Sequence, residues 1–260
     1  MTFWESIILG IIQGLTEFLP VSSSGHLAIG QYFFGLTDPE VNLTYTVFLH
    51  FVSALAVIMA FFSELLDLFR KNFNVLLMII IATIPAAVIG VAFENHIEKL
   101  FSNNIDLIAL GLLFTGGYLF LGDLSWSRSV DSIENARFES IFWVGLAQAV
   151  AIIPGISRSG MTIATGLLTG LEKKSAVKFS FFLSVPIILG ASLYKLKDFS
   201  KISMGFQPIH ILAGGVTCFV VSYIAIKLLI KMVQRGHLYW FGIYCLAAGL
   251  IVLILRLFGI

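Results

Sequence analysis

Residues 13–26, QGLTEFLPVSSSGH, and residues 154–162, PGISRSGMT, interrupt two apolar stretches of the chain and decide its fold. Proline removes a helical hydrogen-bond donor, and serine side chains compete for backbone bonds, so each motif predicts a turn between two short helices. The stretches that they break run from Trp4 to Gly35 and from Phe138 to Leu171. We therefore expect two broken helical hairpins at these places and no uninterrupted helix.

The composition of the whole chain is typical of an integral membrane protein. Of the 260 residues, 58% are hydrophobic and 12% are charged, whereas a soluble domain has about 25% charged residues. Six further apolar stretches approach the roughly 20 residues that a helix needs to cross a bilayer. These stretches are Leu43–Phe62, Phe73–Phe93, Ile105–Leu121, Ala176–Leu196, Ile209–Ile230 and Leu238–Phe258.

We therefore predict an all-α polytopic membrane protein, a single membrane domain over 1–260 with six transmembrane helices and two broken re-entrant helical hairpins. Irregular backbone at membrane depth survives only where it is buried in protein or lines a wet cavity. The two breaks are thus the places where we expect function, and we expect them to converge. The net charge of +1 gives no electrostatic reason to expect a nucleic acid partner.

An internal repeat relates residues of about 1–125 to those of about 136–260. Each half supplies one broken hairpin and three crossings, and an odd number of crossings makes the second half enter the membrane from the opposite side. The pattern predicts an inverted-topology repeat, whose binding site is expected near the midplane where discontinuous helices meet. Identical residues lie 135 places apart in the pairs Gly10 and Gly145, Gln13 and Gln148, Ser22 and Ser157, Ser24 and Ser159, Gly25 and Gly160, and Ala56 and Ala191.

Lysine and arginine residues predict the orientation, because they favour cytoplasmic loops. The predicted side that holds both termini collects Lys99, Lys195, Lys197, Lys201 and Arg256. The opposite side collects Arg70, Lys71, Arg128, Arg137, Lys173, Lys174, Lys178, Lys227, Lys231 and Arg235. The excess predicts that both termini lie outside the cytoplasm.

Arg158 is the most informative single residue, because a cation at membrane depth costs at least about 2.5 to 3.5 kcal/mol and needs a partner. A structural ion pair with Glu17 is one explanation. The other is anion binding, since Ser157, Ser159 and Thr162 supply hydroxyls and a helix is expected to start beside them. Hydroxyls, backbone N–H groups at a helix start and a guanidinium together form a cradle suited to phosphate.

The first break carries complementary groups, with Glu17 before the turn and Ser22, Ser23, Ser24 and His26 after it. A capping turn and a satisfied core histidine are the structural alternative. Functionally, the two breaks together supply a nucleophile, a base, an anion clamp and a carboxylate that could hold a cation or orient the base, as phosphoryl transfer requires. The sequence contains no Walker loop, dinucleotide glycine motif or zinc-ligand spacing, which disfavours an ATP-driven machine.

Both motifs closely resemble the signatures of the undecaprenyl-diphosphate phosphatase (bacitracin-resistance) family, and the resemblance covers essentially the whole chain. It implies a hydrolase of the bacterial cytoplasmic (inner) membrane that converts undecaprenyl diphosphate to undecaprenyl phosphate and returns this carrier to peptidoglycan and cell wall synthesis. The polyprenyl diphosphate and membrane lipid would be its partners, and the site would face the outer side. A homodimer is compatible with the sequence.

The resemblance also implies roles for individual residues. Glu17 falls on the acidic end of the family's (Glu/Gln)-x-x-x-Glu motif, Ser23 and His26 on the positions proposed for nucleophile and base, and Arg158 on the phosphate-binding arginine. A phosphoserine route would use His26 as base, and a phosphohistidine route would attack with His26 itself; we favour attack by Ser23. Substrate contacts are expected from Gln13, Ser22, Ser24, Ser157, Ser159 and Thr162.

Three further expectations complete the prediction. Gln13 stands where many family members have a second glutamate, so a divalent cation, Mg or Ca, would have Glu17 as its only protein ligand; the cation itself is expected from the resemblance and from the diphosphate charge. His50 lies inside a predicted span; an interhelical hydrogen bond is the expected role, and a position near the cavity is the alternative. A polyprenyl-phosphate lipid transporter or flippase is the alternative function, because carriers often use inverted repeats with broken helices.

Overall fold

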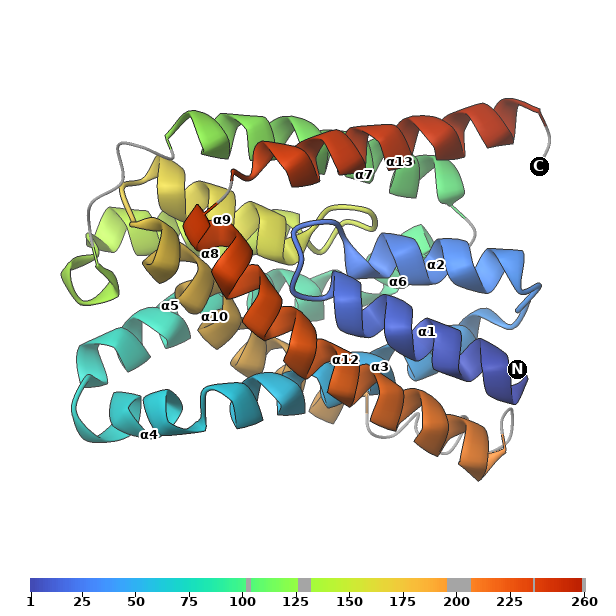
Figure 1. Ribbon diagram of the computed structural model, residues 1–260, viewed down its shortest axis with the longest axis horizontal. Coiled ribbons are helices and arrows are strands. Elements are labelled where there is room, and N and C mark those ends of the chain that lie inside the picture. The colour runs from blue at the N-terminus through green and yellow to red at the C-terminus, as the bar shows by residue number, and fades with distance from the viewer. Residues whose placement is uncertain (102–103, 126–131, 196–206, 236, 259–260) are drawn as a thin grey trace.

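The computed structural model describes all residues except 102–103, 126–131, 196–206, 236 and 259–260. Within this described part the chain is helical and contains no strand. Both termini lie at the same end of the long axis (Figure 1). Of the charges used to predict the orientation, Arg128, Lys197 and Lys201 lie outside the described residues.

Six helices in the described part are long and apolar enough to cross a membrane, which confirms the six predicted transmembrane helices. Many of their large apolar side chains are exposed, as expected where the solvent is lipid. The helices are α3 (Pro39–Ala60), α5 (Phe73–Ala92), α7 (Ile105–Leu124), α10 (Lys173–Tyr194), α12 (Pro208–Arg235) and α13 (Tyr239–Leu257).

Two pairs of short helices occupy the stretches that the motifs interrupt. The first pair is α1 (Phe3–Thr16) and α2 (Ser23–Phe33), and the second is α8 (Phe138–Val150) and α9 (Arg158–Leu168). The predicted breaks therefore exist, whereas the re-entrant course of each pair through a membrane stays a prediction. The remaining elements are α4 (Phe62–Arg70), α6 (Glu94–Phe101) and the 3-10 turn η1 (Ile133–Asn135).

A serine caps the second helix of each pair. The Ser22 hydroxyl accepts a hydrogen bond from the Gly25 backbone N–H at 3.3 Å, and the Ser157 hydroxyl accepts one from the Gly160 N–H at 3.1 Å. Each cap satisfies a donor that would otherwise have no partner at a buried helix start. The serine-rich motifs thus start α2 and α9 at a defined residue.

Gly155 lets the second break pass close to α7. Its φ of 86° lies in the left-handed region, and a Cβ at this position would overlap the carbonyl group of Ile108. Only glycine combines this backbone conformation with so close an approach. The break therefore lies directly against α7.

The helices of the two halves follow the shift of 135 residues found in the sequence. Helix α1 begins at Phe3 and α8 at Phe138, while α2 and α9 each contain 11 residues and begin at Ser23 and Arg158. Their packing corresponds as well, since α1 packs on α12 and α8 packs on α5. These matches support a repeat, and its inverted orientation stays a prediction.

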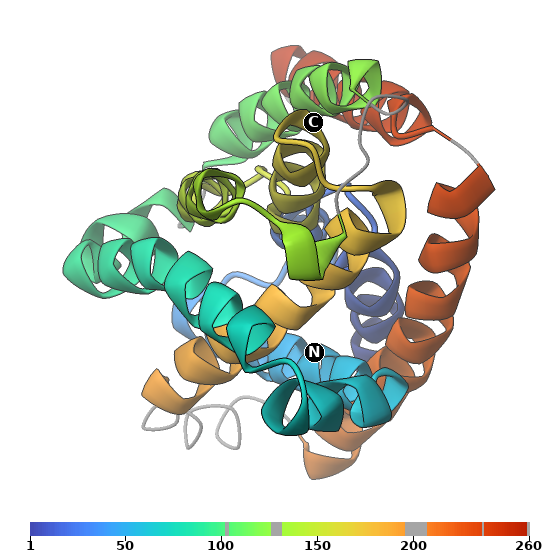
Figure 2. The same cartoon turned by 90° about the vertical axis from the view of Figure 1, so that its left-hand side faces the viewer.

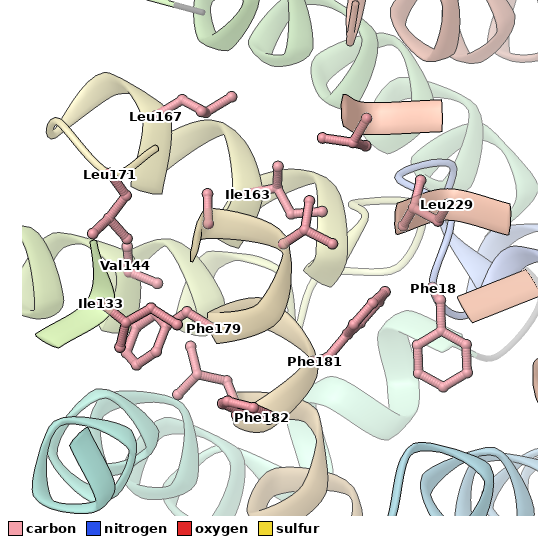
Figure 3. Packing of buried hydrophobic residues seen from close by; sticks show 14 of the residues in the cluster. Phe18, Ile133, Val144, Ile163, Leu167, Leu171, Phe179, Phe181, Phe182 and Leu229 are labelled. Carbon is pink, nitrogen blue, oxygen red and sulfur yellow. The ribbon is translucent and has the colours of Figure 1, made fainter. Parts of the chain in front are cut away.

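Helices α9 and α10 pass through the interior of the molecule, with α5, α7, α12 and α13 around them (Figure 2). Residues from Ser159 to Leu167 of α9 are all buried. Figure 3 shows the apolar cluster that joins α10 to its neighbours and includes Phe18, from the first break, and Phe181. The two rings meet edge to face with centroids 5.5 Å apart, an arrangement favoured by aromatic quadrupoles. This contact holds the first break against α10.

Candidate active site

The two breaks meet in the interior, as expected from the sequence. The Arg158 guanidinium donates from Nη2 to Glu17 Oε1 at 2.6 Å, across 141 residues of chain. The Ser159 hydroxyl donates to the Leu19 carbonyl oxygen at 3.0 Å. One ion pair and one hydrogen bond to backbone therefore join the helix start at Arg158 to the turn after Glu17.

Glu17 is the centre of this polar cluster, although its residue is only 5% exposed. Besides the contact of Oε1 with Arg158, its Oε2 atom accepts hydrogen bonds from Gln13 Nε2 at 2.9 Å and from the Ser23 hydroxyl at 2.7 Å. His50 Nε2 lies 3.1 Å from the same oxygen. A buried carboxylate is tolerated when it is paired and hydrogen-bonded in this way.

Four different elements place these side chains. Gln13 and Glu17 are four residues apart at the end of α1, on one face of the helix, and the Glu17 backbone N–H donates to the Gln13 carbonyl at 2.9 Å. Ser23 begins α2, His50 lies in α3 and Arg158 begins α9. The cluster therefore forms only when the helices are packed.

Arg158 is held on two sides but keeps donors for a ligand. In addition to the Glu17 pair, Nη1 donates to the Ser180 carbonyl oxygen of α10 at 3.1 Å. The Thr162 hydroxyl donates to the Arg158 carbonyl at 2.9 Å and pairs with the Ser180 hydroxyl at 2.7 Å. A guanidinium has further N–H groups beyond the two used here. The structural ion pair is thus present, and it leaves room for an anion-binding role.

The other serines predicted to bind substrate build the turns. Ser22 and Ser24 place their hydroxyl oxygens 3.4 Å apart, and Ser157 and Ser159 place theirs 3.2 Å apart. The Ser157 backbone N–H also donates to the Thr115 hydroxyl of α7 at 3.0 Å. These contacts show that the serines stabilise the turns. Their contacts with substrate, like those of Gln13 and Thr162, stay predictions.

His26 lies at the edge of the cluster, against α13. Its Nδ1 atom is 2.7 Å from the Ser22 carbonyl oxygen, and its Nε2 atom is 2.7 Å from the Tyr244 hydroxyl. The two rings stack with an interplanar angle of 12° and centroids 5.6 Å apart. Both ring nitrogens therefore have partners other than Ser23, the residue that His26 was expected to assist.

Two residues of this region were missed as site residues by the sequence. His50 makes the predicted interhelical contact, but the contact is to Glu17, at the centre of the cluster. Tyr244, which holds His26, had no signal of its own. A single histidine in an apolar helix is a signal that could have indicated a site residue. One tyrosine among many aromatic residues is not.

The donor set does not fit a divalent cation held by Glu17 alone. Its two carboxylate oxygens are already engaged by Arg158, Gln13, Ser23 and His50. Among the described residues no group of three His, Cys, Asp or Glu side chains could hold a metal ion. Gln13 Oε1 is buried and has no hydrogen-bond partner among the residues that the structure describes. One amide oxygen beside a cation-paired carboxylate is nevertheless a weak site for a cation that prefers several oxygens.

Together, the fold and site define a multi-pass membrane protein with a buried serine, carboxylate and arginine cluster. The chain belongs to the bacitracin resistance protein BacA family, whose model matches residues 6–251. This membership confirms the resemblance carried by the two motifs.

Relatives named undecaprenyl-diphosphatase align over nearly their whole length. The one from Methanobrevibacter smithii is 42% identical, with 97% of each chain covered. Those from Desulforapulum autotrophicum and Christiangramia forsetii are each 38% identical, with 98% of each chain covered.

Proposed function

We propose that this protein is a membrane phosphatase that hydrolyses undecaprenyl diphosphate to undecaprenyl phosphate and inorganic phosphate. The single observation that carries the proposal is the position of Glu17, whose carboxylate accepts a hydrogen bond from the Ser23 hydroxyl and forms an ion pair with Arg158. A hydroxyl, its acceptor and an anion-binding cation are thereby gathered at one place. The relatives named undecaprenyl-diphosphatase support the choice of substrate.

In the proposed reaction the Ser23 oxygen attacks the terminal phosphorus. A bond forms between this oxygen and phosphorus, and the bond from phosphorus to the bridging oxygen breaks, which releases undecaprenyl phosphate. Glu17 Oε2, 2.7 Å away, orients the hydroxyl and receives its proton. Water then hydrolyses the phosphoserine and restores Ser23.

Arg158 would stabilise the charge on the phosphoryl oxygens during this transfer. Phosphoryl transfer depends mainly on positioning and electrostatic stabilisation, and arginine presents several donors in a fixed plane to a phosphate. The starts of α2 and α9, at Ser23 and Arg158, add backbone N–H groups of the polarity that anions prefer.

His26 keeps its predicted role as base for Ser23 only if it leaves the Tyr244 hydroxyl, to which its Nε2 atom is bonded. Trapping the phosphoenzyme with labelled substrate tests the route. Label on Ser23 supports the proposal, and label on His26 would establish a phosphohistidine route in its place.

The direct test is phosphate release from C55 diphosphate by the pure protein in detergent, with and without a chelator. Phosphate release by the wild-type protein supports the function, and its absence would contradict it. Loss of release with the chelator would support a divalent cation, Mg or Ca, that arrives with the diphosphate.

A polyprenyl-phosphate lipid transporter or flippase is the alternative function. A carrier has no use for a serine hydroxyl bonded to a buried carboxylate beside an arginine, so the cluster favours the phosphatase. Movement of intact lipid in liposomes, with no phosphate liberated, would favour the carrier.

For the location we propose the bacterial cytoplasmic membrane, with the site open to the outer side and both termini outside. The two termini lie at one end of the molecule (Figure 1), which supports a common side. Labelling a Thr2→Cys variant in intact cells with a membrane-impermeant thiol reagent tests the side, because native Cys218 and Cys245 are buried. Labelling in intact cells supports the proposed orientation. Labelling that occurs only after the cells are lysed would reverse it. Light scattering of the detergent-solubilised protein tests whether the protein forms a homodimer.

A further inference from the structure

His50 points into the active site from the middle of α3. Its Nδ1 atom lies 2.8 Å from the Thr46 carbonyl oxygen of the preceding turn. Because a carbonyl oxygen only accepts, Nδ1 carries a proton and donates it there. The Glu17 carboxylate also only accepts, so Nε2 carries a proton as well and His50 bonds Oε2 as an imidazolium. The bond to Thr46 fixes the ring so that Nε2 faces the reacting pair, at 3.1 Å from Glu17 Oε2 and 3.5 Å from the Ser23 hydroxyl oxygen.

His50 gives Oε2, the carboxylate oxygen that faces Ser23, a contact from a helix other than α1 and α2. Arg158 holds Oε1, while Oε2 faces Ser23 and is also bonded by Gln13. Gln13 belongs to α1, and Glu17 is the residue that caps the end of the same helix. Gln13 therefore cannot fix the carboxylate relative to α2, which begins at Ser23. His50 can do so, because its helix packs against both α1 and α2.

Helix α3 is a firm support for this task. The Tyr45 hydroxyl donates to the Ser6 carbonyl oxygen of α1 at 3.4 Å, and the ring of Tyr45 is buried. Ser53, three residues after His50, donates to the His50 carbonyl at 2.7 Å and accepts from Gln13 Nε2 at 3.5 Å. Helix α3 is therefore tied to α1 at two further points.

We propose that His50 is a positioning residue for the phosphatase reaction. Its imidazole holds the Glu17 carboxylate in the place where that carboxylate orients the Ser23 hydroxyl for attack. This inference rests on the proposed function, because it takes Ser23 as the attacking group. His50 acts through Glu17 and needs no contact with the lipid, so its loss should reduce turnover more than substrate binding.

The test compares His50→Ala with His50→Gln, since the glutamine amide nitrogen reaches about as far as Nε2 and donates without a ring. Residues that orient the ligands of a metal ion are typically worth about 10- to 100-fold in affinity or activity, and we take the same scale for a residue that orients a carboxylate. We expect His50→Ala to lower kcat by about that factor with little change in KM, and His50→Gln to recover most of the loss. His210→Ala is the matched control, since His210 also bonds a backbone carbonyl through Nδ1, that of Met1, and lies outside the site. Its activity should equal that of the wild-type protein.

A second measurement separates this inference from the proposed function. The rate at which a fluorophosphonate probe labels Ser23 reports the reactivity of the hydroxyl and requires no lipid substrate. Labelling should fall in His50→Ala and recover in His50→Gln, even if another lipid proves to be the substrate. Normal kcat and labelling in His50→Ala, or equal losses in both variants, would overturn the positioning role.

Discussion

The first and second breaks of the chain share a local plan. Ser22 and Ser157 each cap a helix of 11 residues and each place their hydroxyl near that of a serine two residues later, Ser24 or Ser159. The matched residues therefore build the turns. Similar local sequences can form the same cap at two places because capping needs only neighbours in the chain.

In the proposed reaction, the residues that do not match between the two breaks carry the chemistry. At the shift of 135, Arg158 stands where the first break has Ser23, and Ile152 stands where it has Glu17. The first break thus supplies hydroxyl and carboxylate, and the second supplies the cation that pairs with them. The two halves differ at the positions where an active site needs unlike groups.

The first break is also strained where the second is not. Ser22 has a φ of 69°, in the left-handed region that non-glycine residues rarely adopt, whereas its counterpart Ser157 has a φ of −80°. Strain of this kind is concentrated at functional sites and is held by the surrounding structure. It falls immediately before Ser23, the proposed nucleophile.

The largest expected effect comes from removing the Ser23 hydroxyl, which has no counterpart in the second break. Ser23→Ala should lower phosphate release by about 10⁴-fold or more, because no attacking oxygen remains. Ser24→Ala, which removes a hydroxyl engaged with Ser22, should have a much smaller effect. Steady-state release from C55 diphosphate measures both, and equal losses in the two variants would contradict the assignment of Ser23.

The second largest effect is expected from replacing Arg158, the cation of the second break. Arg158→Ala should reduce activity by about 10³-fold, the scale on which an arginine stabilises a phosphoryl transition state. Arg158→Lys should recover part of it, since lysine restores charge without the planar fork. Circular dichroism in detergent verifies helix content, and unimpaired turnover of folded Arg158→Ala would refute the site.

A smaller, structural effect is expected at Gly155 of the second break. Gly155→Ala should destabilise the protein by about 3 kcal/mol, because the new Cβ meets the Ile108 carbonyl group and the φ of 86° is unfavourable for alanine. Gly117→Ala is the control, since no atom of the described residues lies within 4 Å of a Cβ there. Unfolding in a denaturing detergent gives the comparison, and equal stability of the two variants would show that α7 can move away.

The smallest effect should come from the shared caps. Ser157→Ala should lower the free energy of unfolding by about 1 kcal/mol, the usual contribution of a serine cap. Ser22→Ala removes the equivalent bond, so a similar value is expected. The same unfolding measurement applies, and a loss several times larger for one cap would show that the two turns are not equivalent in energy.

Much of this arrangement could be predicted from the sequence. The six long helices follow from apolar runs, and the breaks follow from proline and serine, because both signals act over neighbouring residues. The pair of Glu17 and Arg158 was foreseen as one of two explanations, since a buried cation requires a counter-charge. Family membership confirmed what the two motifs had suggested.

By itself, then, the sequence determined the solvent of the protein, the number of spans and the two turns that hold polar groups. Only the tertiary structure decided that His50 lies beside Ser23, 27 residues away in the chain, and that His26 lies against Tyr244, 218 residues away. The physical reason is that hydropathy and capping are local properties of a segment. Which side chains meet across helices depends on how whole helices pack, and no short segment encodes that alone.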